Sequence, residues 1–282
     1  MIWQPSQISK AILDRSWKLI TDTPYKVTAR WLFYVLLQEG YYNKKSDYKN
    51  KFIKLLSTAR HEQHENWRPD TLEDDSRQAI VRGYGWASVD KWLHDIPDYI
   101  PCQLDKWVGE KTYVELWFEA NGMKNQFEYY TDFITLRPMG GQPSIPYKYE
   151  AAKALEWAAK TYGVPVVVLY FGDLDTGGEF IGDAVDRDTH KWCGVDYKFI
   201  RCGLTIEQVE KYGVPENPDK PGDYQWEALA GDREYAAGEI IRDAIKTFMR
   251  LDAFRTKCGN IEKSEALATE RLRHELSTLD IS

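Results

Sequence analysis

The 282-residue chain has few cysteines, no long apolar run and no glycine-rich phosphate loop, and each shortage excludes a class of protein. Its four cysteines, at positions 102, 193, 202 and 258, form no Cys-x-x-Cys pair, which excludes common zinc motifs and favours free thiols. No apolar stretch reaches about 18 residues and no signal-peptide pattern opens the chain, so we expect no membrane span and a cytoplasmic protein. The absence of Gly-x-x-x-x-Gly-Lys-Ser/Thr leaves no ATP-binding signature.

Acidic residues outnumber basic residues, 44 to 37. The formal net charge of −7 argues against a surface that binds nucleic acid everywhere, so any DNA-binding surface has to be local. The hydrophobic content of 43% argues against wholesale disorder, and the length permits two domains with a substantial core.

The most informative segment is an apolar run, Val166 to Phe171, that ends in Gly-Asp-Leu-Asp-Thr-Gly-Gly. Such a run is typical of a parallel strand buried on both faces. Asp173 and Asp175 then fall at the carboxyl end of the strand, where open α/β sheets bind ligands. Spaced two apart, they are able to offer Mg²⁺ the oxygen ligands it prefers. The alternative is an ordinary strand-to-helix turn in which Asp175 caps the helix.

A further carboxylate, Glu119, ends another strand-like segment. The pattern around both segments predicts a parallel βαβ series of the α/β class. The expected strands cover 112–118, 132–137, 165–171 and 196–203, and the expected helices cover 121–130, 149–162 and 177–191. Glu119, Asp173 and Asp175 are expected to converge at one edge of this sheet.

Glu119 and the Gly-Asp-Leu-Asp-Thr-Gly-Gly turn resemble the acidic signature of Toprim domains. The nearer likeness is to the topoisomerase VI A subunit and the meiotic double-strand-break transesterase, and especially to small phage and bacterial proteins of that type. The segments 204–221 and Gln225-Trp-Glu-Ala-Leu also resemble those small proteins. The likeness covers about residues 20–252. It implies a helical, winged-helix-like N-terminal domain followed by a Toprim domain, which is Rossmann-like with a mainly parallel sheet.

The resemblance also implies catalytic roles. In Thr28-Ala-Arg-Trp-Leu-Phe-Tyr34, Tyr34 corresponds to the nucleophile and Arg30 to a phosphate-orienting neighbour. Glu119, Asp173 and Asp175 would hold Mg²⁺ or Mn²⁺, and the product would be a 5′-phosphotyrosyl link to DNA. A free phenol is a poor nucleophile, so it needs a cation, a base or a polarised phosphate before it attacks. The alternative for Tyr34 is an ordinary core position on an apolar helix.

The resemblance implies partners as well. Two-strand breakage implies a homodimer on double-stranded DNA, and in this family the tyrosine of one subunit works with the metal site of the other. Topoisomerase activity would require a separate ATPase subunit. The sequence departs from the family where Ala120 and Asn121 replace a basic residue after Glu119, and where Phe33 replaces the first tyrosine of a common pair.

Basic residues near the N-terminus are candidates for DNA contact. Helices are expected over 7–20, 28–38 and 46–63, and the last of these carries or follows a basic cluster. Its members are Lys44, Lys45, Lys49, Lys51, Lys54 and Arg60. Such a helix suits a major groove with its lysines on phosphates, and a solvated charged face is the alternative. Arg137, in the glycine-rich stretch 137–144, is a further candidate phosphate contact, with a plain βα connection as its alternative.

The expected domains are 1–105, 106–255 and a charged C-terminal helix within 256–282, with an irregular boundary stretch over 83–111. The last helix is expected to pack on the body or to pair subunits. Three functions remain open at this point. They are an Mg²⁺-dependent DNA strand-breaking transesterase of the topoisomerase type, a hydrolytic Toprim nuclease without tyrosine chemistry, and a non-catalytic DNA-binding protein.

Overall fold

A four-stranded parallel sheet forms the centre of the protein, as the βαβ pattern predicts. The computed structural model describes residues 3–69, 71–72 and 88–279. The strands are β1 (Tyr113–Phe118), β2 (Thr135–Pro138), β3 (Val166–Phe171) and β4 (Lys198–Gly203), in the order β2-β1-β3-β4. All neighbouring pairs are parallel, which confirms the α/β class.

The second strand is shorter than expected. It begins at Thr135 rather than at position 132, because Asp132 and Phe133 have positive φ angles of 31° and 56°. A backbone with positive φ leaves the extended region, so the strand cannot start until this turn is complete.

The strand order reverses between β1 and β3. The chain passes from β1 to β2 on one side and then returns to place β3 on the other side of β1. Every residue of both strands is buried, and their registers pair Phe118 with Phe171. The two strands therefore end level with each other at a topological switch point, where α/β sheets bind ligands.

Helices cover both faces of this sheet. The 3₁₀ turn η2 (Asn121–Met123) leads into α5 (Lys124–Thr131), and α6 (Ile145–Tyr162) and α7 (Thr176–Trp192) follow in the next two crossovers. Because parallel crossovers are right-handed, the reversal of strand order puts α5 on one face and α6 and α7 on the other. After β4 come α8 (Ile206–Tyr212), the 3₁₀ turns η3 (Trp226–Ala228) and η4 (Gly231–Arg233), and α9 (Glu234–Lys246), which packs against α5.

Three of the described helices before the sheet lie close to the expected positions. They are α1 (Gln7–Asp22), α2 (Ala29–Gln38) and α3 (Ile53–His61), the last preceded by a π-helical turn, η1 (Tyr48–Phe52). Ser6 and Thr28 cap α1 and α2 by accepting backbone hydrogen bonds. Among the described residues before β1 there is no strand, so the wing of a winged helix is not seen in that part.

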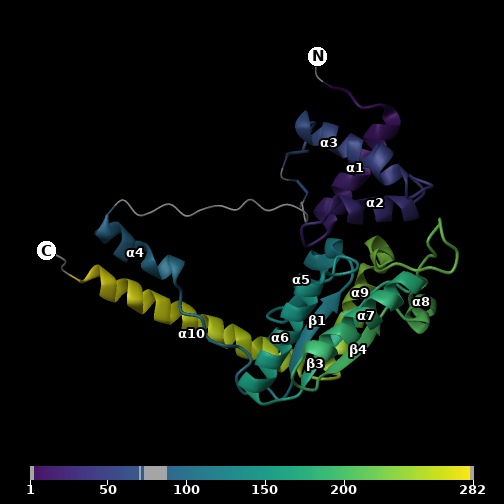
Figure 1. Cartoon of the computed structure of the whole chain (residues 1–282). Helices are drawn as coiled ribbons and strands as arrows, with labels where there is room; N and C mark the ends of the chain where they lie inside the picture. Colours follow the sequence, from purple (N-terminus) through teal and green to yellow (C-terminus); the bar gives the residue numbers. More distant parts are fainter. Residues whose placement is uncertain (1–2, 70, 73–87, 280–282) are drawn as a thin grey trace.

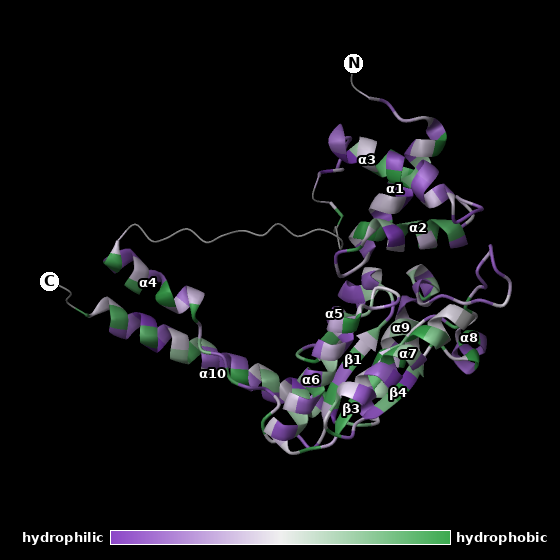
Figure 2. Cartoon of the chain, viewed as in Figure 1, coloured by the Kyte–Doolittle hydropathy of each residue, from purple (hydrophilic) through white to green (hydrophobic). Residues whose placement is uncertain are grey.

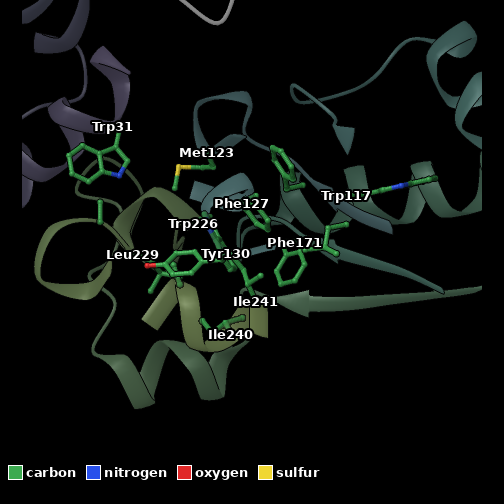
Figure 3. Packing of buried hydrophobic residues seen from close by; sticks show 14 of the residues in the cluster. Trp31, Trp117, Met123, Phe127, Tyr130, Phe171, Trp226, Leu229, Ile240 and Ile241 are labelled. Atoms are coloured by element: carbon green, nitrogen blue, oxygen red, sulfur yellow. The ribbon is translucent and has the colours of Figure 1, made fainter. Parts of the chain in front are cut away.

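The N-terminal helices pack directly on the sheet body. Trp31 of α2 is 3% exposed and belongs to the same continuous buried cluster as Met123 and Leu229. Figure 3 shows Trp31 on the side of the body where those two residues lie. At the end of α2, the Gln38 amide nitrogen donates to the carbonyl oxygen of Ala228 at 3.3 Å.

The last helix, α10 (Leu251–Ser277), leaves the body and pairs with α4 (Val89–Tyr99), as Figure 1 shows. It begins before the expected segment 256–282, because Leu251, Phe254 and Cys258 are buried at helical spacing. Farther out, apolar and hydrophilic residues alternate along it (Figure 2), and Leu267 is 66% exposed. None of the helices in the described residues is long and apolar enough to cross a membrane.

The prediction of an irregular stretch over 83–111 was wrong for the residues of α4; positions 83–87 lie outside the described residues. Ser88 caps this helix by accepting a hydrogen bond from the backbone N–H of Lys91. Pro97 lies in its last turn, where a missing N–H costs one hydrogen bond without ending the helix earlier. Pro97 interrupts the helical pattern in the sequence. The apolar face of α4 is completed only where α10 packs against it.

Candidate active site at the ends of β1 and β3

The carboxyl ends of β1 and β3 bring Glu119 and Asp173 into direct contact. The backbone N–H of Glu119 donates to the carbonyl of Phe171 at 2.9 Å, which extends the strand ladder by one residue. The side chain of Glu119 then turns back, and its Oε2 accepts a hydrogen bond from the backbone N–H of Asp173 at 3.1 Å. These two residues are 54 positions apart in the sequence and meet because the two strands end level.

Two glycines leave the space that the Glu119 carboxylate occupies. A Cβ at Gly178 would lie 2.4 Å from the carbonyl oxygen of Asp173 and 3.0 Å from Glu119 Oε2. A Cβ at Gly172 would also lie 3.0 Å from that carboxylate oxygen. The glycines of this turn are therefore required by close approach, at a position where a backbone has to pass a charged side chain.

Asp173 is a buried carboxylate in a crowded environment. Its Oδ1 accepts a hydrogen bond from the backbone N–H of Trp226 at 2.9 Å, and its Oδ2 faces the Gln225 amide nitrogen at 3.4 Å. Burial raises its pKa well above the ordinary value, and the carboxylates of Glu227 and Glu119 raise it further. Burial likewise raises the pKa of Glu119.

Asp175 has the capping position that the alternative interpretation predicts. It is the N-cap of α7, and its Oδ1 accepts a hydrogen bond from the backbone N–H of Gly178 at 2.5 Å. Its carboxylate still contributes to the raised pKa of both Glu119 and Asp173. It lies near the cluster formed by Glu119 and Asp173 but is engaged by the helix.

Glu227 is a fourth acidic neighbour that motif reasoning did not single out. It lies on η3, its side chain is 1% exposed, and neither carboxylate oxygen accepts a hydrogen bond from the described residues. Its ion-pair partner is Arg30, whose Nε lies 3.1 Å from Oε1. No spacing rule links position 227 to positions 119 and 173, so only the likeness of the Gln-Trp-Glu-Ala-Leu segment pointed to this region.

The chemistry of this acidic cluster, which we define as Glu119, Asp173, Asp175 and Glu227, fits a divalent cation. The pKa values of Glu119 and Asp173 are raised and the carboxylate oxygens of Glu227 accept no hydrogen bond from the described residues, and such groups are stabilised when a cation joins them. Yet no three His, Cys, Asp or Glu residues in the described part of the chain are arranged as a ready ligand set. Asp175 caps α7, and both oxygens of Asp173 accept hydrogen bonds, from Gln225 and from Trp226 of η3.

Tyr34, from α2, reaches this cluster through one intervening side chain. Its hydroxyl donates to Gln225 Oε1 at 2.7 Å, and Lys45 Nζ donates to the same oxygen at 2.5 Å. Arg30 and Lys45 both lie over the tyrosine ring, at 5.8 Å and 5.6 Å from its centroid. Burial raises the pKa of Tyr34 to about 12, with Glu227 adding to the effect and Arg30 opposing it. The phenol is therefore protonated at neutral pH.

A polar cleft of about 560 Å³ lies between the N-terminal helices and the strand ends. Arg30 and Arg60 line one wall, and Glu119, Asp173 and Gly140 line the other. Tyr34 lines a neighbouring pocket of about 160 Å³ together with Lys45 and Gln225. Gln225 thus separates the tyrosine from the acidic wall of the larger cleft.

The remaining candidate DNA contacts divide into two groups. Lys44, Lys49, Lys51 and Lys54 are exposed, and Lys51 pairs with Asp47 at 2.8 Å. Lys45 and Arg60 are partly buried and face the two pockets instead.

Arg137 has a structural partner. Its Nε donates to Glu115 at 2.8 Å, and Glu115, which is 1% exposed, also accepts hydrogen bonds from Tyr113 and Trp117. The pair joins β2 to β1, which supports the interpretation of Arg137 as part of the sheet rather than as a phosphate contact.

Comparisons of the chain with protein-family models, with curated proteins and with solved structures found no match. The function therefore has to be inferred from the side chains that meet around the cleft.

Proposed function

We propose that the protein is a DNA strand-breaking transesterase similar to the topoisomerase VI A subunit, with Tyr34 as its nucleophile. The observation that carries the proposal is the contact of Tyr34 with Gln225, whose amide faces Asp173. A tyrosine, two cations and an acidic cluster from distant parts of the chain meet at the cleft and the pocket beside it. Pockets that gather groups with perturbed pKa values are typical of active sites.

The reaction is a phosphoryl transfer in which the enzyme mainly positions the reacting groups and neutralises developing charge. The Tyr34 oxygen forms a bond to phosphorus while the bond from phosphorus to the 3′ oxygen of DNA breaks. The phenol loses its proton and the leaving 3′ oxygen gains one, so the step is balanced without oxidant or reductant. Arg30 and Lys45 lie beside the ring, where they stabilise developing phenolate charge.

Glu119, Asp173 and Asp175 are the residues that would hold Mg²⁺ or Mn²⁺, and Asp175 would do so through the carboxylate oxygen that does not cap α7. The cation would supply polarisation of the phosphodiester and charge neutralisation. In the same proposal, residues 1–105 form the DNA-binding part and 106–255 a Toprim domain. The exposed lysines near η1 contact the backbone of double-stranded DNA, and the working form is a homodimer with a separate ATPase subunit.

A hydrolytic nuclease is the second candidate, and the raised pKa of Tyr34 is the observation that favours it. A buried phenol that keeps its proton to about pH 12 is a weak nucleophile unless substrate binding lowers that pKa. In this alternative, water attacks the phosphodiester and Tyr34 only packs between Arg30 and Gln225.

The deciding experiment is a cleavage assay on supercoiled DNA with Mg²⁺ or Mn²⁺, stopped with denaturant, that measures both strand breaks and DNA-attached protein. Transesterification predicts attached protein that is lost in Tyr34→Phe and in Asp173→Ala. Tyr41→Phe, at an exposed tyrosine of the same part of the chain, is the matched control and should cleave normally. Free breaks that survive Tyr34→Phe but not Asp173→Ala identify a nuclease. No breaks with any metal would leave DNA binding, or a cleavage activity that requires the separate ATPase subunit, as the better interpretation.

A further inference from the structure

We propose that Tyr170 is a positioning residue of the metal site, in which its buried hydroxyl donates a hydrogen bond to the Glu119 carboxylate once a divalent cation is bound. The inference rests on the metal site of the proposed function, which the transesterase and the nuclease share. It adds a neutral side chain behind the acidic cluster. Outer hydrogen bonds of this kind orient ligating carboxylates, and their loss typically weakens metal binding by about 10–100-fold.

The Tyr170 hydroxyl is buried without a partner. The side chain is 0% exposed, and its oxygen has no hydrogen-bond partner among the described residues. By contrast, the buried hydroxyl of Tyr197, just before β4, is bonded to Thr189. An unpaired buried hydroxyl costs free energy, so its presence beside an acidic cluster points to a group that is bonded in another state of the site.

The sheet places this hydroxyl on the same face as Glu119. Trp117 of β1 is paired in register with Tyr170 of β3, so their side chains point to one face. Glu119 lies two positions beyond Trp117 and continues the ladder by its bond to Phe171, so its side chain leaves on that face too. A Cβ on Gly172 would lie 3.1 Å from the Tyr170 oxygen and 3.0 Å from Glu119 Oε2. Both oxygens therefore line one small space that a glycine leaves open.

Arg201 of β4 fixes both the phenol ring and the turn that carries Asp173. Its guanidinium lies over the Tyr170 ring, 5.9 Å from the centroid. The same guanidinium donates to the backbone carbonyls of Asp173, at 2.5 Å, and Gly178, at 3.2 Å. On α7, a Cβ at Gly182 would lie 3.0 Å from the ring, so the helix packs closely against it. Because the ring is already held, a hydrogen bond from its hydroxyl would cost little further side-chain entropy.

The hydroxyl is a donor, and Glu119 has acceptor positions to spare. Burial raises the pKa of Tyr170 and the Glu119 carboxylate raises it further, while Arg201 opposes the shift, so the phenol keeps its proton. A carboxylate offers about four acceptor positions, and the backbone N–H of Asp173 occupies one of those on Glu119. A bound cation would fix the position of this carboxylate, and a hydrogen bond to an ionised carboxylate is about twice as strong as one between neutral groups.

Mn²⁺ binding tests the inference without any DNA, through the electron paramagnetic resonance signal of the free ion. Tyr170→Phe removes only the hydroxyl and keeps the packing of the ring. We expect the dissociation constant for Mn²⁺ to rise about tenfold in this variant. An increase of less than about threefold would overturn the inference, and so would a wild type that binds no Mn²⁺.

Thermal melts in a chelator exclude a merely structural role, because the expected effect has the opposite sign. Without a cation the hydroxyl is an unpaired buried group, so Tyr170→Phe is expected to raise the melting temperature by a few degrees. Tyr197→Phe is the matched control, since it removes a bonded hydroxyl and should lower the melting temperature without changing Mn²⁺ affinity. A lower melting temperature in Tyr170→Phe would mean that its hydroxyl is already bonded without a cation, and would overturn the inference.

These measurements separate the inference from the proposed function. Weaker Mn²⁺ binding by Tyr170→Phe than by wild type supports the inference whether or not wild type breaks DNA. Equal binding, together with DNA-attached protein from wild type, would reject the role of Tyr170 and leave the proposed function standing.

Discussion

Arg30 Nε and Glu227 Oε1 lie 3.1 Å apart, and this ion pair joins α2 to η3 at the wall of the cleft. The two partners differ in exposure, since the Arg30 side chain is 50% exposed and that of Glu227 is 1% exposed. The buried carboxylate therefore depends on a cation that solvent partly screens. Nearby, Glu227 also raises the pKa of Asp173, so the pair affects the charge balance of the whole acidic cluster.

Arg30→Ala is expected to destabilise the fold by about 1–2 kcal/mol, less than a fully buried pair because Arg30 is half exposed. The cause is a buried Glu227 carboxylate left without its cation. Urea denaturation measures the loss. Adding Glu227→Gln should restore most of it, and an unaltered penalty in that double variant would contradict the assignment.

Asp173→Asn is expected to raise the melting temperature by a few degrees at neutral pH in the presence of a chelator. The folded pKa of Asp173 is raised above its ordinary value of 3.8, so the native state binds more protons than the unfolded state just above that pH. Stability contributed by this group is thus present in acid and falls as pH rises through the folded pKa. Thermal melts from pH 4 upward should show that the melting temperatures of wild type and Asp173→Asn diverge as pH increases. Parallel curves would contradict a raised pKa of Asp173.

Mg²⁺ is expected to stabilise wild type in proportion to the logarithm of its concentration above the dissociation constant. Asp173→Asn and Glu119→Gln should lose this gain. Asp175→Asn separates a cap from a ligand, since Asn caps a helix about as well as Asp but coordinates a cation weakly. Retained Mg²⁺ stabilisation in Asp175→Asn would identify Asp175 as a cap only, and its loss would identify a ligand.

Gly178→Ala is expected to cost about 1–3 kcal/mol, because the added Cβ would lie 2.4 Å from a backbone oxygen and would displace the Glu119 carboxylate. Denaturant melts should show the lower free energy of unfolding, and the cleavage assay should show a lower rate. Gly259→Ala in α10 is the matched control. A Cβ there has nothing within 4 Å, and Ala should stabilise that helix by up to about 1 kcal/mol.

The cleavage rate is expected to rise with pH by about one log unit per pH unit between pH 7 and 9, because Tyr34 is protonated in this range and the phenolate is the attacking form. Single-turnover rates of strand breakage at each pH provide the measurement, with DNA-attached protein quantified in the same samples. A flat profile, or the same profile in Tyr34→Phe, would argue for attack by water.

The parts of the fold that could be predicted are those that depend on local pattern. The apolar run Val166–Phe171 identified the central strand, and its carboxyl end placed Asp173 beside Glu119 because parallel strands end at the same edge. The helix α4 was missed because its apolar face is completed by α10, which lies more than 150 positions later in the chain.

The site as a whole could not be predicted for a related reason. Gln225 and Glu227 lie in a segment between α8 and α9 without regular periodicity, and their importance comes from single contacts with α2. The Tyr34–Gln225 bond spans 191 positions of the sequence. Neither helical nor strand periodicity records a contact of that kind, and the two alternatives for Asp175 had the same sequence pattern.

In the sequence, α4 precedes the four strands and α10 follows them. The pairing of these helices therefore joins two distant stretches of the chain. Arg273 binds Asp98, Thr269 accepts from the backbone N–H of Cys102, and Glu265 accepts from that of Leu104, so the two stretches run antiparallel. A truncation just before Leu251 would therefore strip the partner from a helix more than 150 residues upstream. The smallest fragment that keeps this pairing intact has to begin before α4 and end after α10.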